Sequence, residues 1–172
     1  MNDVVNTGTR IIYTNSEGKA KKQPKLVTKN NSIESRTETY LKLFKQDYNE
    51  WKIVGSNRWI KTEVLVCIAF ADTHLGYAMK SENNIGNVGN NDRWDTISYN
   101  NRLAGIMAIW ATLSNKYLWN KKTIGDLSYA WWCKIDCWKV YASSNDNRQN
   151  NVLNCLSNIY NKVITQDFTF RK

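Results

Sequence analysis

The chain has 172 residues, the length of one domain, and 42% of them are hydrophobic, which excludes a wholly disordered protein. Its longest apolar stretch, VLVCIAFA at residues 64–71, is far shorter than the roughly 20 residues that cross a bilayer, and no signal peptide is visible at its start. Lysine and arginine outnumber aspartate and glutamate by 24 to 15, a net charge of +9. This charge favours a polyanionic partner: nucleic acid, anionic lipid or bacterial wall polymer.

Residues 1–34 are polar, carry the basic run KAKKQPKLVTK at 19–29, and show no sustained hydrophobic period. Such composition is typical of a solvated tail, and a basic arm that binds nucleic acid or wall polymer is the alternative. We therefore predict a flexible basic linker or arm over residues 1–34, followed by one folded domain over 35–172.

Hydrophobic periodicity predicts a mainly α domain. The stretch at 64–71 is apolar on all sides and is expected to form the central helix of the core. Thr123 and Asp126 have the spacing of a capping box, which predicts a short helix over 124–127. Three further helices are indicated by apolar faces at spacings of three and four residues, which run from Tyr40 to Trp51, from Leu103 to Tyr117, and from Val152 to Val163.

Residues 81–101, SENNIGNVGNNDRWDTISYNN, are different in character, because glycine, asparagine and aspartate dominate them. The apolar residues among them, Ile85, Val88, Ile97 and Tyr99, alternate over short distances. This pattern predicts an irregular loop with a short β-hairpin.

Tryptophan is as frequent as glycine, with 8 of each, and several tryptophans occupy turn-like positions. One interpretation is that these side chains form a platform on which sugar rings stack. The other is translational: a UGA codon that its own cell reads as glycine would be written as tryptophan. The positions concerned are Trp94, Trp119, Trp131, Trp132 and Trp138.

The cysteines and the single histidine, His74, offer little catalytic or metal chemistry. Cys133 and Cys137 are four residues apart and are candidates for a local disulfide in an exported protein. Cys67 and Cys155 fall within helical patterns, so we predict that they are buried as small apolar residues. A zinc site needs two closely spaced cysteine pairs, or one pair with histidines. The pair Cys133/Cys137 and one distant histidine do not make this ligand set, so we expect no metal and no cofactor.

The remaining candidate for chemistry is a carboxyl group beside an amide-rich loop. Asp72 follows the apolar helix, where partial desolvation would raise its pKa as a general acid requires. Cleavage of a glycosidic bond needs such an acid to protonate the leaving oxygen. Asn83, Asn84, Asn87 and Tyr99 could then bind sugar hydroxyl and acetamido groups. The alternative is that Asp72 is an ordinary helix cap or surface group.

The stretch VLVCIAFADTHLGYAMKSENNIGNVG, at residues 64–89, resembles the core motif of the glucosaminidase-type (mannosyl-glycoprotein endo-beta-N-acetylglucosaminidase-like) domain of the lysozyme-like superfamily. In that family a helix of small apolar residues runs to a catalytic glutamate, which is followed by a serine, a glycine and an Asn-Asn-x-x-Gly loop. The matching positions in this chain are Asp72, Thr73, Gly76 and the loop NNIGNVG at 83–89. The segment after this loop is similar to the family's short strand, with Tyr99 as its tyrosine.

The resemblance covers residues 57–128 and implies a mainly α (α+β) lysozyme-like domain with a small β-hairpin beside a substrate groove. It implies hydrolysis or lytic cleavage of β-1,4 bonds between amino sugars, with Asp72 as general acid and Thr73, Asn84 and Tyr99 beside the substrate. Candidates for a second carboxylate are Glu82, Asp92 and Asp95.

This chain has aspartate where the family has glutamate. Aspartate is one methylene shorter, and a misplacement of about 1 Å can cost around a hundredfold in rate. The domain could therefore be an active glycosidase, a weak enzyme, a glycan binder or a structural relic.

The leading hypothesis is a peptidoglycan-acting glycosidase of the N-acetylglucosaminidase or muramidase type, which is extracellular or in the cell envelope if the chain is exported. A non-catalytic glycan-binding module on the same fold is the alternative. A nucleic-acid-binding protein is the least favoured, because the basic residues are scattered rather than aligned on one helix face. We expect a monomer.

Overall fold

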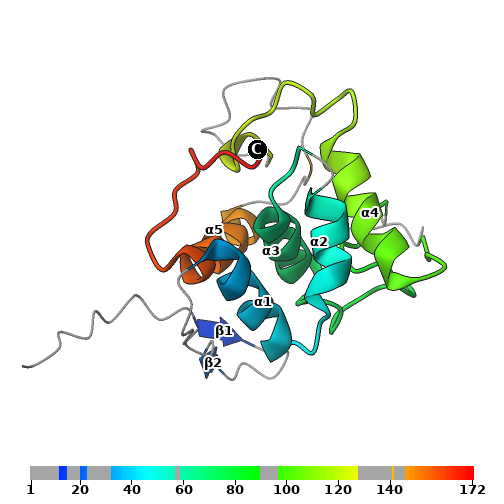
Figure 1. The fold of residues 1–172 in the computed structure, drawn as a ribbon, viewed down its shortest axis with the longest axis horizontal. Coiled ribbons are helices and arrows are strands. Elements are labelled where there is room, and N and C mark those ends of the chain that lie inside the picture. The colour runs from blue at the N-terminus through cyan, green and yellow to red at the C-terminus, as the bar shows by residue number, and fades with distance from the viewer. Residues whose placement is uncertain are drawn as a thin grey trace, which may run out of the picture.

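The computed structural model describes residues 12–14, 20–22, 32–56, 59–89, 97–127, 141 and 146–172. In these ranges the chain is mainly α-helical, as predicted (Figure 1). The elements in chain order are β1 (Ile12–Thr14), β2 (Ala20–Lys22), α1 (Ile33–Leu43), α2 (Tyr48–Ser56), α3 (Thr62–Thr73), α4 (Arg102–Leu113), the 3-10 turn η1 (Gly125–Leu127) and α5 (Asp146–Tyr160).

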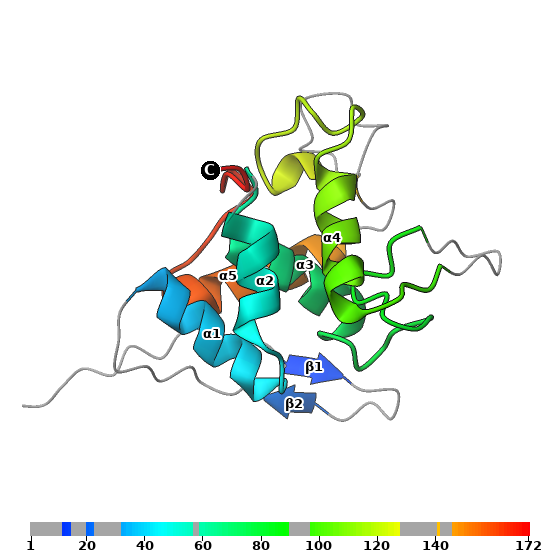
Figure 2. The same ribbon diagram turned by 45° about the vertical axis from the view of Figure 1, so that its right-hand side comes forward.

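Helix α3 is the centre of the core. Every side chain from Val64 to Phe70 is buried, so the prediction of a helix without a solvent-facing stripe is confirmed. Helices α1, α2, α4 and α5 all contact it (Figures 1 and 2). At the end of α3, His74 has a left-handed backbone with φ 51°, and its N–H bonds to the Phe70 carbonyl at 2.9 Å. The last turn of α3 therefore carries Asp72 to the edge of the core.

The single helix predicted between Tyr40 and Trp51 is wrong, because the chain forms two helices, α1 and α2, in this region. Between them Lys45 has a φ of 55°, which a right-handed helix does not allow. The Asp47 side chain accepts the N–H of Asn49 at 2.9 Å and so starts the second helix. Tyr40 and Trp51 are both buried, so the apolar period correctly indicated burial without showing the turn.

Helix α4 is shorter than the predicted helix, since it ends at Leu113 and residues 114–120 form turns. Trp110 packs against the core, while Trp119, beyond the helix end, has 75% of its surface exposed. The other tryptophans in the predicted turn positions lie outside the described residues.

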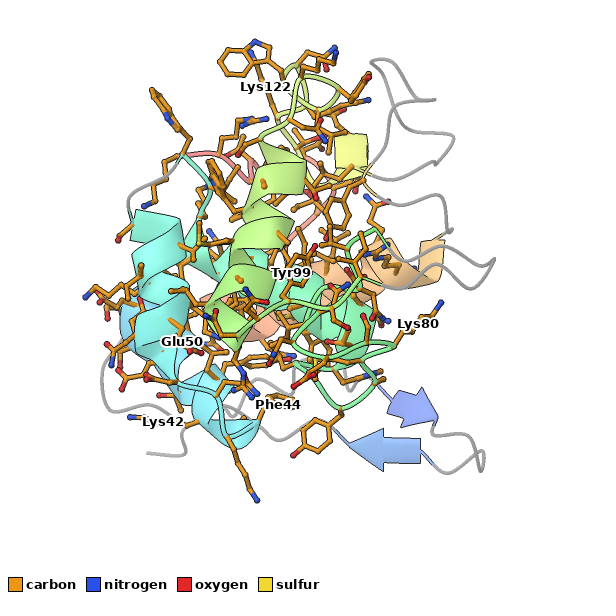
Figure 3. The ribbon with its side chains drawn as sticks, turned by 90° about the vertical axis from the view of Figure 1, so that its right-hand side faces the viewer. Lys42, Phe44, Glu50, Lys80, Tyr99 and Lys122 are labelled. Carbon is orange, nitrogen blue, oxygen red and sulfur yellow. A yellow bond between two sulfur atoms is a disulfide. The ribbon has the colours of Figure 1, made fainter. Side chains whose placement is uncertain are left out.

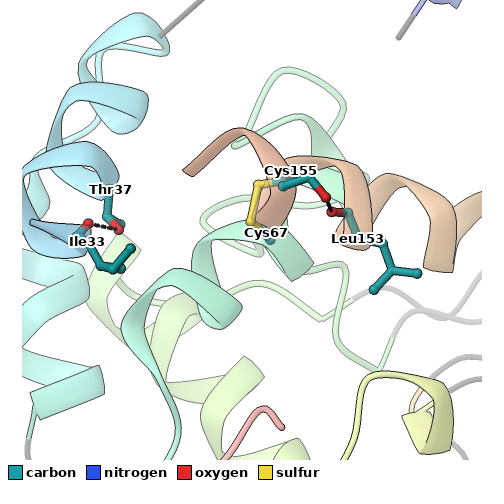
Figure 4. The surroundings of a disulfide bond; sticks show 6 residues. Ile33, Thr37, Cys67, Leu153 and Cys155 are labelled. Atoms are coloured by element: carbon teal, nitrogen blue, oxygen red, sulfur yellow. Dashed lines mark hydrogen bonds between the residues drawn. A yellow bond between two sulfur atoms is a disulfide. The ribbon is translucent and has the colours of Figure 1, made fainter. Parts of the chain in front are cut away.

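Helices α3 and α5 lie antiparallel and are joined by a disulfide. Cys67 and Cys155 are bonded, with Cα atoms 5.5 Å apart (Figure 4). Near the start of α3, the Tyr160 hydroxyl donates to Glu63 Oε1 at 2.6 Å. The prediction that these cysteines are only buried apolar residues is therefore wrong, since helical spacing cannot show a partner 88 residues away.

Cys133 and Cys137, the pair for which we predicted a disulfide, lie outside the described residues. That disulfide stays a prediction.

Removing the Cys67–Cys155 disulfide tests how firmly it ties α3 to α5. The bond closes a loop of 88 residues, and a loop of that size is expected to contribute about 4 kcal/mol to stability. We expect the double variant Cys67→Ala/Cys155→Ala to lose stability of that order in urea unfolding. In the matched control Cys133→Ala/Cys137→Ala, a reductant should still lower the unfolding midpoint. If reductant leaves the unfolding midpoint of this control unchanged, the Cys67–Cys155 disulfide is contradicted.

The capping box predicted at the start of the short helix is confirmed. Asp126 Oδ2 accepts the backbone N–H and the hydroxyl of Thr123, at 3.1 and 2.9 Å, and the Asp126 N–H donates to the Thr123 hydroxyl at 3.3 Å. Turn η1 ends at Leu127, whose carbonyl accepts the N–H of Tyr141 at 2.9 Å. This bond ties Tyr141 to the end of η1, and its ring contacts Arg148 in the first turn of α5.

The predicted β-hairpin is not seen among the described residues of the asparagine-rich segment. Residues 81–89 form turns, residues 97–100 contain no strand, and 90–96 are outside the described part. The two described pieces nevertheless lie side by side, since Tyr99 N–H donates to the Glu82 carbonyl at 3.0 Å.

Strands β1 and β2 fall within the segment predicted to be a flexible arm, and they pair antiparallel with Ile12 opposite Lys22. Helix α1 begins at Ile33, two residues before the predicted start of the domain. None of the helices in the described ranges has the length and apolar character that a bilayer crossing requires.

Candidate active site

The Asp72 carboxyl is held inside the protein by the last turn of α3. Its side chain is 3% exposed, and Oδ1 forms an ion pair with Nη2 of Arg148, from the first turn of α5. The second oxygen, Oδ2, is buried and has no hydrogen-bond partner in the described part of the chain. Buried carboxyl oxygens normally have a partner, so Oδ2 is unusual in this respect.

Two opposing effects set the protonation of Asp72. Burial raises the pKa of Asp72 from its usual 3.8 to about 6, although the charge of Arg148 and the hydroxyl of Tyr141 lower it. Burial disfavours the ionised carboxylate, whereas a nearby cation favours it. The result is a carboxyl group that exchanges its proton near neutral pH, as a general acid must.

Tyr141 lies between the ion pair and the rest of the candidate site. The guanidinium of Arg148 lies 5.0 Å from the centre of the Tyr141 ring, a cation–π contact. The Tyr141 hydroxyl is buried and not in hydrogen-bond geometry, yet it is close enough to act on Asp72. Burial and the nearby Asp72 raise the pKa of Tyr141 well above its usual value, and Tyr99 adds to this effect. Arg148, Asp72, Tyr141 and Tyr99 therefore form one electrostatic cluster.

Tyr99 connects this cluster to the surface. Burial raises its pKa, and it lies alongside α4, as Figure 3 shows. An open groove of ≈ 390 Å³ runs there, lined by Val88, Tyr99, Ala104, Met107, Ala108, Trp110, Ala111 and Thr112. A smaller cavity of ≈ 30 Å³ is lined by Ile68, Ile124, Leu127, Tyr141, Arg148, Gln149 and Val152. Asp72 itself lines neither.

Thr73, which the resemblance places beside the substrate, is fully buried. Its hydroxyl lies 2.5 Å from the Ile85 carbonyl and accepts the N–H of Gly76 at 2.9 Å. It therefore ties the end of α3 to the asparagine-rich loop. Its predicted contact with a substrate stays a prediction.

The three predicted asparagines hydrogen-bond to the protein's own backbone. Asn83 Nδ2 donates to the Tyr99 carbonyl at 2.8 Å, and Asn87 Nδ2 donates to the Asp72 carbonyl at 3.2 Å. Asn84 is buried, and its Nδ2 donates at 2.9 Å to the carbonyls of Val88 and Ile97. Asn83 and Asn87 also have left-handed backbones, which asparagine tolerates. The amides thus build the loop that positions Tyr99.

Of the candidate second carboxylates, Glu82 alone lies within the described residues. Glu82 is exposed on the loop. Asp92 and Asp95 lie outside the described residues. Nor do the described ranges contain three or more His, Cys, Asp and Glu side chains grouped as metal ligands.

Arg148 and Tyr141 were not among the predicted site residues. For Arg148 a signal exists: it lies four residues before Val152 and seven before Cys155, on the face of α5 that points to the core. A basic residue on such a face needs an acidic partner. Tyr141 carries no comparable signal, because it lies in none of the periodic segments.

No protein-family model, curated protein or solved structure matched this chain. The resemblance of residues 64–89 to the glucosaminidase-type motif therefore stays a hypothesis. The function of the chain has to be inferred from the geometry and chemistry of its own residues.

Gly105 is the point at which α4 meets the asparagine-rich loop. A Cβ at this position would overlap the carbonyl oxygen of Asn83. We expect Gly105→Ala to lower the free energy of unfolding by about 1–3 kcal/mol, because the added methyl overpacks the contact. At an exposed helix position, replacing glycine by alanine raises stability by about 1 kcal/mol. The sign of the change in unfolding free energy therefore shows whether Gly105 contacts the loop. Urea unfolding measures it, and a neutral or stabilised variant would show that the loop does not contact α4 this closely.

The raised pKa of Asp72 predicts how stability depends on pH. The folded chain binds the Asp72 proton more tightly than the unfolded chain, so the contribution is complete below about pH 4 and is lost as the pH rises through about 6. Relative to Asp72→Asn, the wild type should lose about 3 kcal/mol between pH 3.5 and 7, from about 1.4 kcal/mol per pKa unit. Urea unfolding across this range tests it.

The exposed Asp167 supplies the matched control, since Asp167→Asn removes a carboxyl group far from α3 in sequence and outside the core. It should leave the pH dependence of stability as in the wild type. A wild-type stability that rises relative to Asp72→Asn over the same interval would mean that Arg148 outweighs burial.

Proposed function

We propose that this chain is a peptidoglycan-acting glycosidase of the lysozyme-like type, in which Asp72 is the general acid. The observation that carries the proposal is a desolvated carboxyl, with its pKa raised to about 6 and one oxygen without a partner, at the end of the central helix. The motif at residues 64–89 supports the same assignment. The cleaved bond in this proposal is a β-1,4 linkage between amino sugars.

The protonation of this cluster suits acid catalysis. Asp72 lines neither the open groove nor the small cavity, so the mechanism requires that glycan binding exposes Oδ2. In this mechanism Oδ2 gives its proton to the leaving glycosidic oxygen, and Asp72 becomes negative. The guanidinium of Arg148, paired with Oδ1, then stabilises the new charge without moving. The open groove lined by Tyr99 and α4 is the candidate path for the glycan.

Completion of the reaction can follow two routes. Hydrolysis uses water and a second carboxylate, for which Glu82, Asp92 and Asp95 are the candidates. Lytic cleavage uses an internal hydroxyl of the sugar instead. The products distinguish the two routes, since hydrolysis gives a reducing end and lytic cleavage an anhydro sugar.

The disulfide and the charge support action outside the cytosol. Cys67 and Cys155 are fully buried, and structural disulfides persist mainly in oxidising compartments. A net charge of +9 favours contact with an anionic wall. We therefore propose the extracellular space or the cell envelope as the site of action.

A non-catalytic glycan-binding module is the second candidate, and one observation favours it. The Asp72 side chain is only 3% exposed and lies under Arg148, which is the arrangement of a structural ion pair. On this interpretation the groove binds glycan and no bond is cut.

Replacing the acid tests the proposal. With purified peptidoglycan, we expect Asp72→Asn to lower the rate of cleavage by at least a hundredfold, because proton delivery is lost. Wild-type activity should fall as the pH rises above about 6, where Asp72 ionises. Product analysis by mass spectrometry measures cleavage, and co-sedimentation measures binding, which should be unchanged.

Asp167→Asn serves as the control and should cleave at the wild-type rate. Equal activity of Asp72→Asn and the wild type would remove Asp72 from the mechanism. Binding by the wild type without any cleavage product would favour the binding module.

A further inference from the structure

We propose that Arg148 is the positioning residue of this site: by binding Oδ1 it orients the Asp72 carboxyl, so that Oδ2 is the oxygen that takes and releases the proton. The catalytic consequence of this rests on the proposed function. The pairing of Arg148 with the Asp72 carboxyl does not, and it can be tested on the protein without any substrate.

The geometry holds the guanidinium on two sides. Its Nη2 pairs with Asp72 Oδ1, and its central carbon lies 5.0 Å from the centre of the Tyr141 ring. The Arg148 side chain is 25% exposed, so part of it still reaches solvent while the carboxylate does not. A planar guanidinium held in this way has few orientations, and its partner oxygen is fixed with it.

The two carboxyl oxygens are therefore not equivalent. Oδ1 accepts from a permanent cation, and an oxygen paired in this way is disfavoured as the site of a proton. Oδ2 is buried and has no partner in hydrogen-bond geometry among the described residues, and the Tyr141 hydroxyl lies close enough to act on the carboxyl. Among the described residues, the titratable groups that act on Asp72 are Arg148 from α5 and Tyr141 just before α5. Tyr99, from the asparagine-rich segment, acts on Tyr141 in turn. None of them competes with Oδ2 as the acidic group.

The position of Arg148 is set by the helix pair rather than by its own contacts alone. Seven residues further along α5, Cys155 is bonded to Cys67. At the far end of α5, Tyr160 is hydrogen-bonded to Glu63 on α3. The first turn of α5 therefore cannot slide along α3 without straining both links, and Arg148 remains opposite Asp72.

A double-mutant cycle tests the pairing without relying on activity. Urea unfolding from pH 3.5 to 9 would compare the wild type with Asp72→Asn, and Arg148→Met with Arg148→Met/Asp72→Asn. Loss of the cation should move the Asp72-dependent fall in stability upward by at least about 1 pH unit. Arg102→Met is the matched control: Arg102 on α4 bonds to Gln46 at 2.9 Å, and its loss should leave the pH interval unmoved. If the Asp72-dependent fall in stability occurs at the same pH in Arg148→Met as in the wild type, the proposal is overturned.

Arg148→Lys separates orientation from charge. The lysine ammonium keeps the positive charge but lacks the planar fork of the guanidinium. The pH at which the Asp72-dependent fall in stability occurs should therefore stay within about half a pH unit of the wild type. On peptidoglycan its kcat should drop by about tenfold or more with little change in KM. A wild-type kcat would overturn the positioning role. If the wild type cleaves nothing, the proposed function fails while the stability cycle still tests the pairing of Arg148 with Asp72.

Should Arg148→Met fail to fold, a measurement on the wild type replaces it. At pH 7 the Arg148 side-chain nitrogen signals in an NMR spectrum should be separate and slow to exchange with solvent, and in Asp72→Asn they should average. Averaged signals in both proteins would contradict the pairing.

Discussion

The antiparallel pairing of α3 with α5 is the constraint on which the site depends. Helix α3 has no polar stripe, so its last turn delivers Asp72 to a place where its side chain is only 3% exposed. A lone carboxylate in such a place would be too costly, and α5 supplies a cation, Arg148, that makes it tolerable. The Cys67–Cys155 disulfide and the Glu63–Tyr160 hydrogen bond fix the register in which the two groups meet.

The balance between burial and the cation gives the carboxyl its chemical character. If Arg148 prevailed, Asp72 would be permanently ionised and could not act as an acid. If burial acted alone, the proton would be held too tightly to be released near neutral pH. Burial prevails by a moderate margin and leaves the pKa of Asp72 at about 6. The resulting loss of stability at neutral pH is about 3 kcal/mol, which a domain of this size can carry within the usual 5–15 kcal/mol.

Local signals in the sequence predicted the local features well. The all-round apolar stretch at 64–71 predicted the central helix, and the spacing of Thr123 and Asp126 predicted a capping box that the structure contains. Several of the predictions that failed depend on contacts between distant segments, and others on local turns. The disulfide joins residues 88 apart, and the cation beside Asp72 comes from another helix. The turn at Lys45 was missed because the apolar period continues through it. Among the candidate site residues, Asp72 was predicted from its position at a helix end and is a buried carboxyl there, whereas the amides of Asn83, Asn84 and Asn87 donate to backbone carbonyls.

The most direct test of this account is the titration of the Asp72 carboxyl carbon, followed by carbon NMR in the oxidised wild-type chain and assigned with Asp72→Asn. A desolvated carboxyl opposed by the guanidinium of Arg148 predicts a midpoint near pH 6. A midpoint at or below the usual 3.8 would mean that the ion pair prevails over burial, and the proposed acid would be a permanently charged structural group.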